Sequence, residues 1–368
     1  MKRIIIPLML LVLLLAACGG GETPETTAAP AVTTEALAVP TLAPQTEAPA
    51  IPTQPVTEPV TTQAPTTQAP TEPPLSPEEQ ARLDFYTEFW ELDPEETDAW
   101  LEAHPEYFSG VYSEISVNEA WLSDKGLDLY TTQGHQVLAI DAANHILILR
   151  IWPAGSRGVL AIAKDPSRLH LCPAERLGDH GERIGSIAQR NNGLLAMTGS
   201  GFLDEGGNGN GGQLAGYCKC DGVEYGSPMG WNYARFGLLE SNWAYVGHAE
   251  GRTGDTTTDA MEFEPAVLID GELQDPGIWN GENPRACIGQ TWQGDILMLG
   301  VEGRYSDSPG CSVSECGKIM AQYRGWNAIN VDGGTTAIVW YRGEPIMRCS
   351  NRSTPEGRYL PNAWVYTK

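Results

Sequence analysis

Beyond about residue 130 the chain consists of short apolar runs separated by Gly, Asn and Asp. Short runs bounded by turn-forming residues are typical of β-strands, whereas a helix usually extends over more residues with a period near 3.6. The clearest runs are Ile146–Trp152, Val159–Ala163, Leu194–Met197, Ala266–Ile269, Ile296–Val301 and Ala337–Tyr341. Helices are predicted only near 183–191 and 312–323 within this part. The pattern predicts a mixed α/β (α+β), strand-rich single domain over residues 111–368, long enough for one sizeable core.

Residues 1–18 have the features of a bacterial lipoprotein signal peptide. Two basic residues precede an apolar stretch at 4–15, which is too short to span a bilayer. The sequence LAAC at 15–18 resembles a lipoprotein cleavage box, in which Cys18 becomes the lipidated first residue. Acyl chains at ~0.8 kcal/mol per buried methylene would anchor the protein to the extracellular face of the cell membrane. Ordinary secretion, with cleavage before Cys18, is the alternative.

The two segments that follow differ sharply in composition. Residues 19–75 are almost all Thr, Pro, Ala, Glu and Gln, which cannot bury a core, so a disordered linker is predicted. Residues 76–110 contain SPEE at 76–79 and DPEE at 93–96. Each offers an N-cap residue, a proline at the first helical position and an acidic residue at the third. A helical pair is expected, either packed on the next domain or forming a separate binding module.

The charge distribution limits the classes of partner. The chain has 47 acidic and 23 basic residues, a formal net charge of -24. A protein that binds nucleic acid needs a basic face for the phosphate backbone, so nucleic acid is not an expected partner. An anionic substrate would have to be bound by a few local arginines.

The cysteines and histidines suggest no metal or other cofactor. Seven of the eight cysteines follow Cys18, so in an oxidising compartment at least one thiol stays unpaired. Cys311 and Cys316 are close enough for a bridge across a short loop, and the remaining pairing is open. The six histidines have no zinc-ligand spacing.

The strongest candidate for a functional site is the sequence DGGTT at 332–336. Asp332 follows an apolar run, where a strand gives way to a turn. Gly333 and Gly334 would let backbone N–H groups approach a ligand oxygen, and Thr335 and Thr336 add hydroxyl donors. Together these groups would form an anion pocket beside a carboxylate. A plain hairpin turn is the alternative, because Asp-Gly-Gly is common in turns.

Two further polar segments adjoin apolar runs. Glu302 and Arg304 follow the run at 296–301 and place a second acid and a cation at its end. Asn283 and Arg285 flank a proline just before another run, and a guanidinium binds a phosphodiester through paired N–H donors. By spacing alone, a surface ion pair and a solvated loop arginine are the alternatives.

These segments resemble the phosphodiester glycosidase family. The family has NPRTAIG, then an apolar strand leading into DGR, then NLDGGGS; this chain has NPRACIG at 283–289, EGR at 302–304 and NVDGGTT at 330–336. The closing GR-LP-A segment of the family is matched at 356–363. The resemblance covers about residues 137–368, and the last third is its most specific part.

The resemblance implies hydrolysis of a sugar 1-phosphodiester at the glycosidic bond. It suggests α-linked N-acetylglucosamine as the sugar, and the expected substrates are cell-surface or wall glycans. A role in exopolysaccharide assembly or transfer instead of hydrolysis is a further alternative. Asp332 is the first candidate for the catalytic carboxylate and Glu302 the second, because a carboxylate must activate water or attack the anomeric carbon. Arg285 and Arg304, with the amides of the Gly-Gly turn, would hold the phosphate.

Two residues depart from the family pattern. Glu302 stands where the family has Asp, which displaces the carboxylate by one methylene. Thr198 stands where the family has Asn, and if that amide holds a sugar hydroxyl, Thr198 can replace only part of its hydrogen bonding. These departures leave open a different class of function, a catalytically weak or inactive glycan-binding surface lipoprotein whose tryptophans stack on sugars.

Overall fold

The computed structural model describes residues 74–118, 127–230, 233–248, 257–351 and 354–368. The predicted signal peptide, the lipidation site Cys18 and nearly all of the predicted linker lie outside these ranges. Within them, each helix is too short or too polar to cross a bilayer. Residues Glu72–Lys368 form one compact unit.

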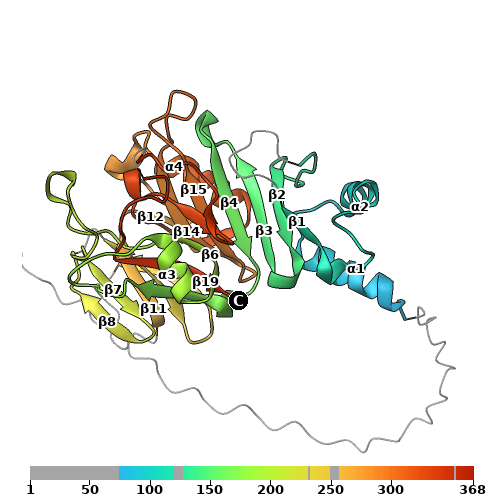
Figure 1. The fold of residues 1–368 in the computed structure, drawn as a ribbon, viewed down its shortest axis with the longest axis horizontal. Coiled ribbons are helices and arrows are strands. Elements are labelled where there is room, and N and C mark those ends of the chain that lie inside the picture. The colour runs from blue at the N-terminus through green and yellow to red at the C-terminus, as the bar shows by residue number, and fades with distance from the viewer. Residues whose placement is uncertain (1–73, 119–126, 231–232, 249–256, 352–353) are drawn as a thin grey trace, which may run out of the picture. The chain divides into compact units, whose positions relative to one another are not determined.

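The largest element is a nine-stranded antiparallel sheet (Figure 1). In spatial order its strands are β1 (Ser116–Asn118), β2 (Gln136–Asp141), β3 (Ile146–Ile151), β4 (Gly158–Ala163), β15 (Ile296–Val301), β14 (Arg285–Thr291), β16 (Gly325–Asn330), β12 (Ala266–Ile269) and β13 (Glu272–Leu273). The pairing of β4 with β15 and of β14 with β16 brings together segments far apart in the sequence.

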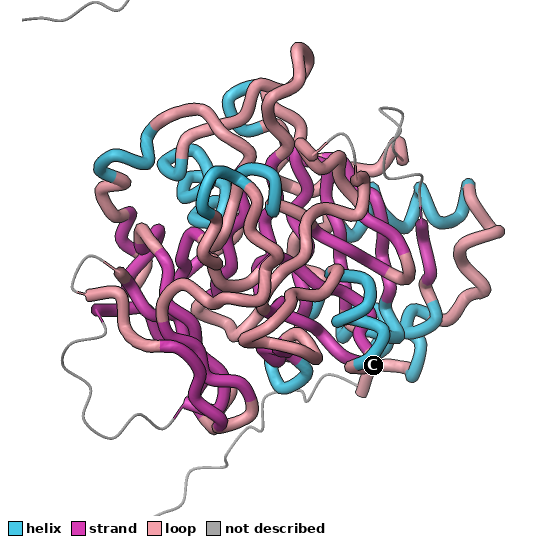
Figure 2. The backbone as a smooth tube through the Cα atoms, turned by 60° about the vertical axis from the view of Figure 1, so that its left-hand side comes forward, coloured by secondary structure: helices cyan, strands magenta, loops and turns pink. Residues whose placement is uncertain are grey.

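Two five-stranded antiparallel sheets complete the strand content (Figure 2). One contains β10 (Ala244–His248), β9 (Ala234–Leu239), β11 (Thr257–Phe263), β7 (Tyr217–Cys220) and β8 (Val223–Gly226). The other contains β18 (Glu344–Pro345), β17 (Val339–Tyr341), β6 (Gly193–Thr198), β19 (Asn362–Thr367) and β5 (Leu169–Pro173). Helix α3 (Ile184–Arg190) packs on the second of these sheets through Ile184 and Ile187.

The nine-stranded sheet is covered on both faces, as β15 illustrates. Ile296 and Met298 belong to the core that this sheet shares with both smaller sheets. Leu297 and Leu299 belong to a second core on the opposite face, which includes residues of helix α4 (Val313–Gln322). Because successive side chains of a strand point to opposite faces, an uninterrupted apolar run is what a strand buried on both sides requires.

The predicted helical pair is present and packs on the nine-stranded sheet. Helix α1 (Pro77–Glu88) begins with a capping box, in which Ser76 and Glu79 exchange hydrogen bonds. Helix α2 (Pro94–Ala103) begins at Asp93, whose carboxylate accepts two backbone N–H groups. Phe85, Phe89 and Trp100 are buried in the same core as strands β2 to β4, which favours packing on the domain over a separate module.

The strand-rich α+β architecture predicted from the sequence is therefore confirmed for the described residues. Strand β15 has the predicted bounds, and α4 is one residue shorter at each end than the predicted 312–323. The predicted boundaries near residues 75 and 110 stay predictions. All seven cysteines after Cys18 are buried thiols here, with the sulfurs of Cys311 and Cys316 3.4 Å apart.

Candidate active site

A cavity of about 470 Å³ opens where strand β16 gives way to the Asp332 turn. Its lining combines carboxylates, guanidinium groups, hydroxyls and one aromatic ring. The lining residues are Phe202, Asp204, Gly207, Arg304, Asp332, Gly333, Gly334, Thr335, Thr336 and Arg358. The cavity therefore unites three separate stretches of sequence with the predicted DGGTT segment.

The turn that carries Asp332 is held by hydrogen bonds from neighbouring segments. The Asp332 N–H donates to the carbonyl of Gly199 at 3.3 Å, and the Gly334 N–H donates to the carbonyl of Pro284 at 3.0 Å. A Cβ at Gly333 would lie 2.9 Å from that Pro284 oxygen, and Gly334 has φ +62°, so both positions favour glycine. The Gly334 amide is thus already engaged, which does not support its predicted role in phosphate binding.

Asp332 is the carboxylate best suited to proton transfer. Burial removes water from its ionised form and raises its pKa to about 7, although a hydrogen bond from Thr336 and the positive charge of Arg358 oppose the shift. Near neutral pH both protonation states are therefore populated. A catalytic base works best when its pKa lies near the working pH.

Two arginines give the cavity its positive charge. Arg304 donates to the side-chain oxygen of Asn283 at 3.4 Å, and its Nη2 would lie 3.2 Å from a Cβ placed at Gly334. Arg358 forms a two-pronged ion pair with Asp204, at 2.5 and 2.8 Å. This pair holds the pKa of Asp204 below its usual range, so Asp204 stays ionised.

Glu302, the second predicted catalytic carboxylate, is not among the residues that line the cavity. Its side chain is completely buried, and its two oxygens accept hydrogen bonds from the backbone N–H and the Nε of Arg348, at 2.9 and 2.6 Å. The Nε of Arg157 lies 3.8 Å from the Oε1 of Glu302. This placement gives no support to a catalytic role and points to a structural one.

Arg285, the predicted phosphate ligand, is also buried away from the cavity lining. Its Nε donates to the carbonyl of Cys311 at 3.1 Å, and its Nη2 donates to the carbonyls of Trp279 and Gly281 at 2.9 and 2.7 Å. These bonds tie together two loops. The guanidinium therefore holds the two loops in place, and the structure does not support a role for Arg285 in phosphate binding.

The other predicted site residues lie at or next to the cavity. Thr335 is part of its lining. Thr198 is buried, and its hydroxyl donates to the carbonyl of Thr336 at 2.5 Å, so it supports the turn from behind. Asn283 acts in a similar way, because its side chain orients Arg304. Their predicted contacts with substrate stay predictions.

Sequence reasoning gave no role to three side chains of the lining: Phe202, Asp204 and Arg358. Arg358 belongs to the closing segment that carried the family resemblance, so a signal for it was present. No signal in the sequence pointed to Asp204, because its partner Arg358 is 154 positions away along the chain. Among the described residues, no group of three or more His, Cys, Asp or Glu side chains is arranged to hold a metal ion.

A comparison with protein families adds to this geometry. The model of the phosphodiester glycosidase family matches residues 191–367, which include Asp332, Arg304 and Arg358. The resemblance to this family is thereby confirmed. The match does not extend over 137–190, where the sequence resemblance was also noted.

Two solved structures are similar to this chain. The catalytic domain of zebrafish N-acetylglucosamine-1-phosphodiester alpha-N-acetylglucosaminidase, auto-inhibited by its pro-peptide, aligns with a TM-score of 0.49 and 19% identity, over 61% of this chain and 82% of that chain. A hypothetical protein from Synechocystis aligns with a TM-score of 0.46 and 11% identity, over 63% of each chain. No curated protein sequence matches the chain.

Proposed function

We propose that this protein is a hydrolase that cleaves a sugar 1-phosphodiester at its glycosidic bond, with α-linked N-acetylglucosamine as the sugar. One observation carries the proposal. Asp332, a carboxylate with a pKa raised to about 7, shares a cavity with the guanidinium groups of Arg304 and Arg358. The match of residues 191–367 to the phosphodiester glycosidase family supports the same reaction class.

The reaction follows from what each group can do. Ionised Asp332 accepts a proton from water, whose oxygen bonds to the anomeric carbon, while the electron pair of the C1–O bond leaves with the phosphate. The departing phosphomonoester is a good leaving group, so it needs little protonation. Arg304 and Arg358 face the negative charge that grows on it and stabilise that charge by guanidinium–phosphate hydrogen bonds.

Asp332 is assigned the base because the other acid of the cavity is not suited to the role. Both oxygens of Asp204 are bonded to Arg358, and its pKa is held low. A carboxylate in this state is a weak base. Asp204 instead sets the position of Arg358, the second candidate phosphate ligand.

Product analysis tests the proposal. The secreted full-length Cys18→Ala chain is incubated with UDP-N-acetylglucosamine, and free sugar and UDP are quantified, with Asp332→Asn as the matched variant. We expect sugar release by the parent chain, a kcat/KM that rises with pH through about 7, and a loss of about a thousandfold in the variant. Full activity of a well-folded Asp332→Asn variant would contradict the mechanism. Saturable glycan retention without any product would favour the binding-protein alternative.

We also propose that the enzyme acts on the extracellular face of a bacterial membrane, anchored through lipidated Cys18. The support is the LAAC sequence that follows an apolar stretch at the N-terminus. Metabolic labelling with a fatty-acid probe should mark the wild type and not Cys18→Ala. The unmodified variant should appear in the medium.

A further inference from the structure

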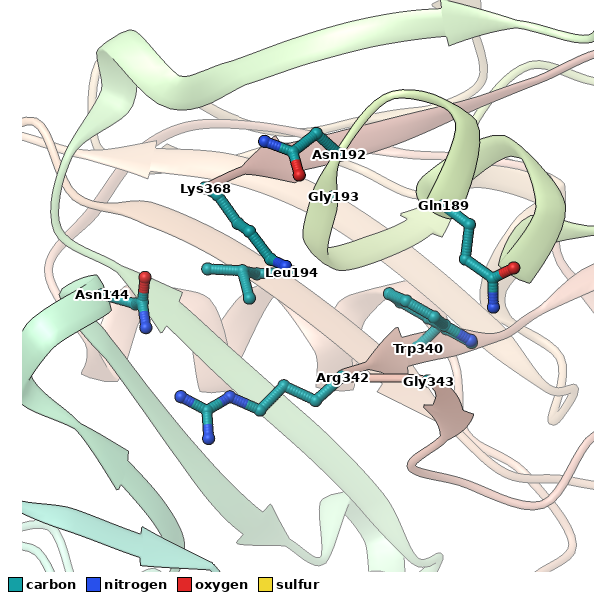
Figure 3. Close-up of a pocket in the computed structure, with 9 residues that line it drawn as sticks. All are labelled: Asn144, Gln189, Asn192, Gly193, Leu194, Trp340, Arg342, Gly343 and Lys368. Carbon is teal, nitrogen blue, oxygen red and sulfur yellow. The ribbon is translucent and has the colours of Figure 1, made fainter.

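A second hollow lies at the end of strands β6 and β17 that is remote from the Asp332 cavity (Figure 3). Strand β6 runs from Gly193, which lines this hollow, to Thr198, which supports the Asp332 turn. The hollow has a volume of about 570 Å³, within the range of ~300–1,000 Å³ that is typical of ligand pockets. The side chains that matter for the argument are Asn144, Gln189, Asn192, Trp340, Arg342 and Lys368.

The hollow continues into a smaller one of about 230 Å³. Both are lined by Gln189 and Trp340, and the smaller one reaches Arg183 and Glu356. The two hollows adjoin each other beside helix α3, and we call them together the α3 groove. Two adjoining hollows suit several linked units better than a single small molecule.

The charged side chains that line the larger part of the α3 groove are basic. Arg342 and Lys368 line it, and its lining includes no Asp or Glu side chain. This is unusual for a chain with a formal net charge of -24. Arg342 is fixed in place by an ion pair with buried Asp141 at 2.6 Å, yet its side chain stays 39% exposed. The groove therefore presents the exposed part of one oriented guanidinium, which also pairs with Asp141, and the ammonium group of Lys368.

Uncharged polar groups accompany the two cations. Figure 3 shows the Gln189 amide and the Trp340 indole on one side of the hollow, and Arg342 and Asn144 extending toward the other. Trp340 is only 4% exposed, and it lines both hollows. Amide side chains can both donate to and accept from hydroxyl groups, whereas the indole only donates. Sugars offer hydroxyls along their whole length.

We propose that the α3 groove binds an acidic glycan chain, one that bears carboxylate or phosphate groups, at a site separate from the Asp332 cavity. Arg342 and Lys368 contact the acidic groups, while Gln189, Asn144 and the Trp340 indole contact hydroxyls. This binding holds a polymer on the protein surface whether or not the cavity is occupied. It does not depend on the hydrolytic function proposed above.

Affinity gel electrophoresis of the full-length Cys18→Ala chain tests the proposal, with polygalacturonate as the acidic polymer and dextran as the neutral one. Retardation by polygalacturonate is expected, with weakening at high salt, because exposed charges are screened. Lys368→Glu should weaken binding about tenfold, and Gln189→Ala should weaken it less. Lys318→Glu is the matched control, because it makes the same charge change at an exposed lysine of α4.

Three outcomes would overturn the proposal. The first is retardation by dextran equal to that by polygalacturonate, and the second is equal binding by Lys368→Glu and Lys318→Glu. The third is loss of polymer binding in Arg304→Gln, which would place the polymer in the Asp332 cavity instead. Retained binding in Arg304→Gln together with loss in Lys368→Glu would support two separate sites.

Discussion

Two turns in this molecule begin with an acid followed by glycine at the end of a buried strand, yet the two acids have different environments. Asp332 follows β16 and faces a cavity, where burial raises its pKa to about 7. Glu302 follows β15 and lies completely buried between Arg348 and Arg157. The same local pattern thus places one carboxylate at a cavity and the other in an internal ion pair. The difference is that arginines pair directly with the Glu302 carboxylate, whereas the Asp332 carboxylate faces the cavity.

The arginines show the same division. Arg285 is buried, and its guanidinium donates hydrogen bonds to three backbone carbonyls. Arg304, which lies on the neighbouring strand end, lines the cavity. An arginine that is saturated with carbonyl oxygens fixes loops, whereas one that faces a cavity can bind an anion.

The largest expected difference between Asp332 and Glu302 is in the effect of their substitution on kcat. We expect Asp332→Asn to lower kcat by about 10³-fold, because removing a general base costs about 10²–10⁴-fold. Glu302→Gln should stay within about tenfold per folded molecule, since its carboxylate does not line the cavity. The measurement is kcat normalised to the folded fraction from circular dichroism. Equal losses of kcat in the two variants would contradict the distinction between a catalytic Asp332 and a structural Glu302.

Stability should show the reverse order. Glu302→Gln should lower the free energy of unfolding by about 3–5 kcal/mol, because it removes a completely buried carboxylate that pairs with Arg157 and Arg348, although Arg348 keeps its ion pair with Asp307. Urea unfolding at pH 7 measures this. Glu315→Gln, which removes a surface ion pair with Lys318, is the control and should change stability by less than about 1 kcal/mol. A small effect at Glu302 would contradict its structural role.

The pH dependence of stability should sharpen the contrast. The pKa of Asp332 is higher in the folded state, about 7, than its ordinary value of 3.8. The folded protein therefore binds this proton more tightly, and ionisation costs stability as pH rises from about 4 to 7. Asp332→Asn should be more stable than wild type by about 2–4 kcal/mol at pH 8 and similar to it at pH 4. Parallel stability curves over that range would show that the carboxylate is not desolvated.

The arginines should give the smallest difference. Arg304→Gln should lower kcat/KM by about 10- to 100-fold, since a hydrogen bond to a charged group contributes about 1.5–3 kcal/mol. Arg285→Gln should lower the thermal midpoint while leaving KM close to wild type, because its donors hold loops together. Initial rates and a thermal melt on both variants make the comparison. A larger rise in KM for Arg285→Gln would restore it as the phosphate ligand.

The sequence by itself determined the local features of this protein. The uninterrupted apolar run of β15 required a strand covered on both faces, and the capping residues Ser76 and Asp93 marked the starts of two helices. It also placed Asp332 in a glycine turn after a strand. These features depend on side-chain periodicity and on hydrogen bonds between residues a few positions apart, so they can be read along the chain.

Only the tertiary structure decided which of the candidate carboxylates and arginines lie together in the cavity. Arg358 reaches Asp204 across 154 positions, and Arg348 reaches Glu302 across 46. No local pattern records such pairings. Whether a carboxylate is free to accept a proton depends on lost hydration and on nearby charges, and in a folded chain both are supplied by residues distant in sequence. The candidate acids and arginines could therefore be found in the sequence. Which of them line the cavity and which only hold the fold together could not.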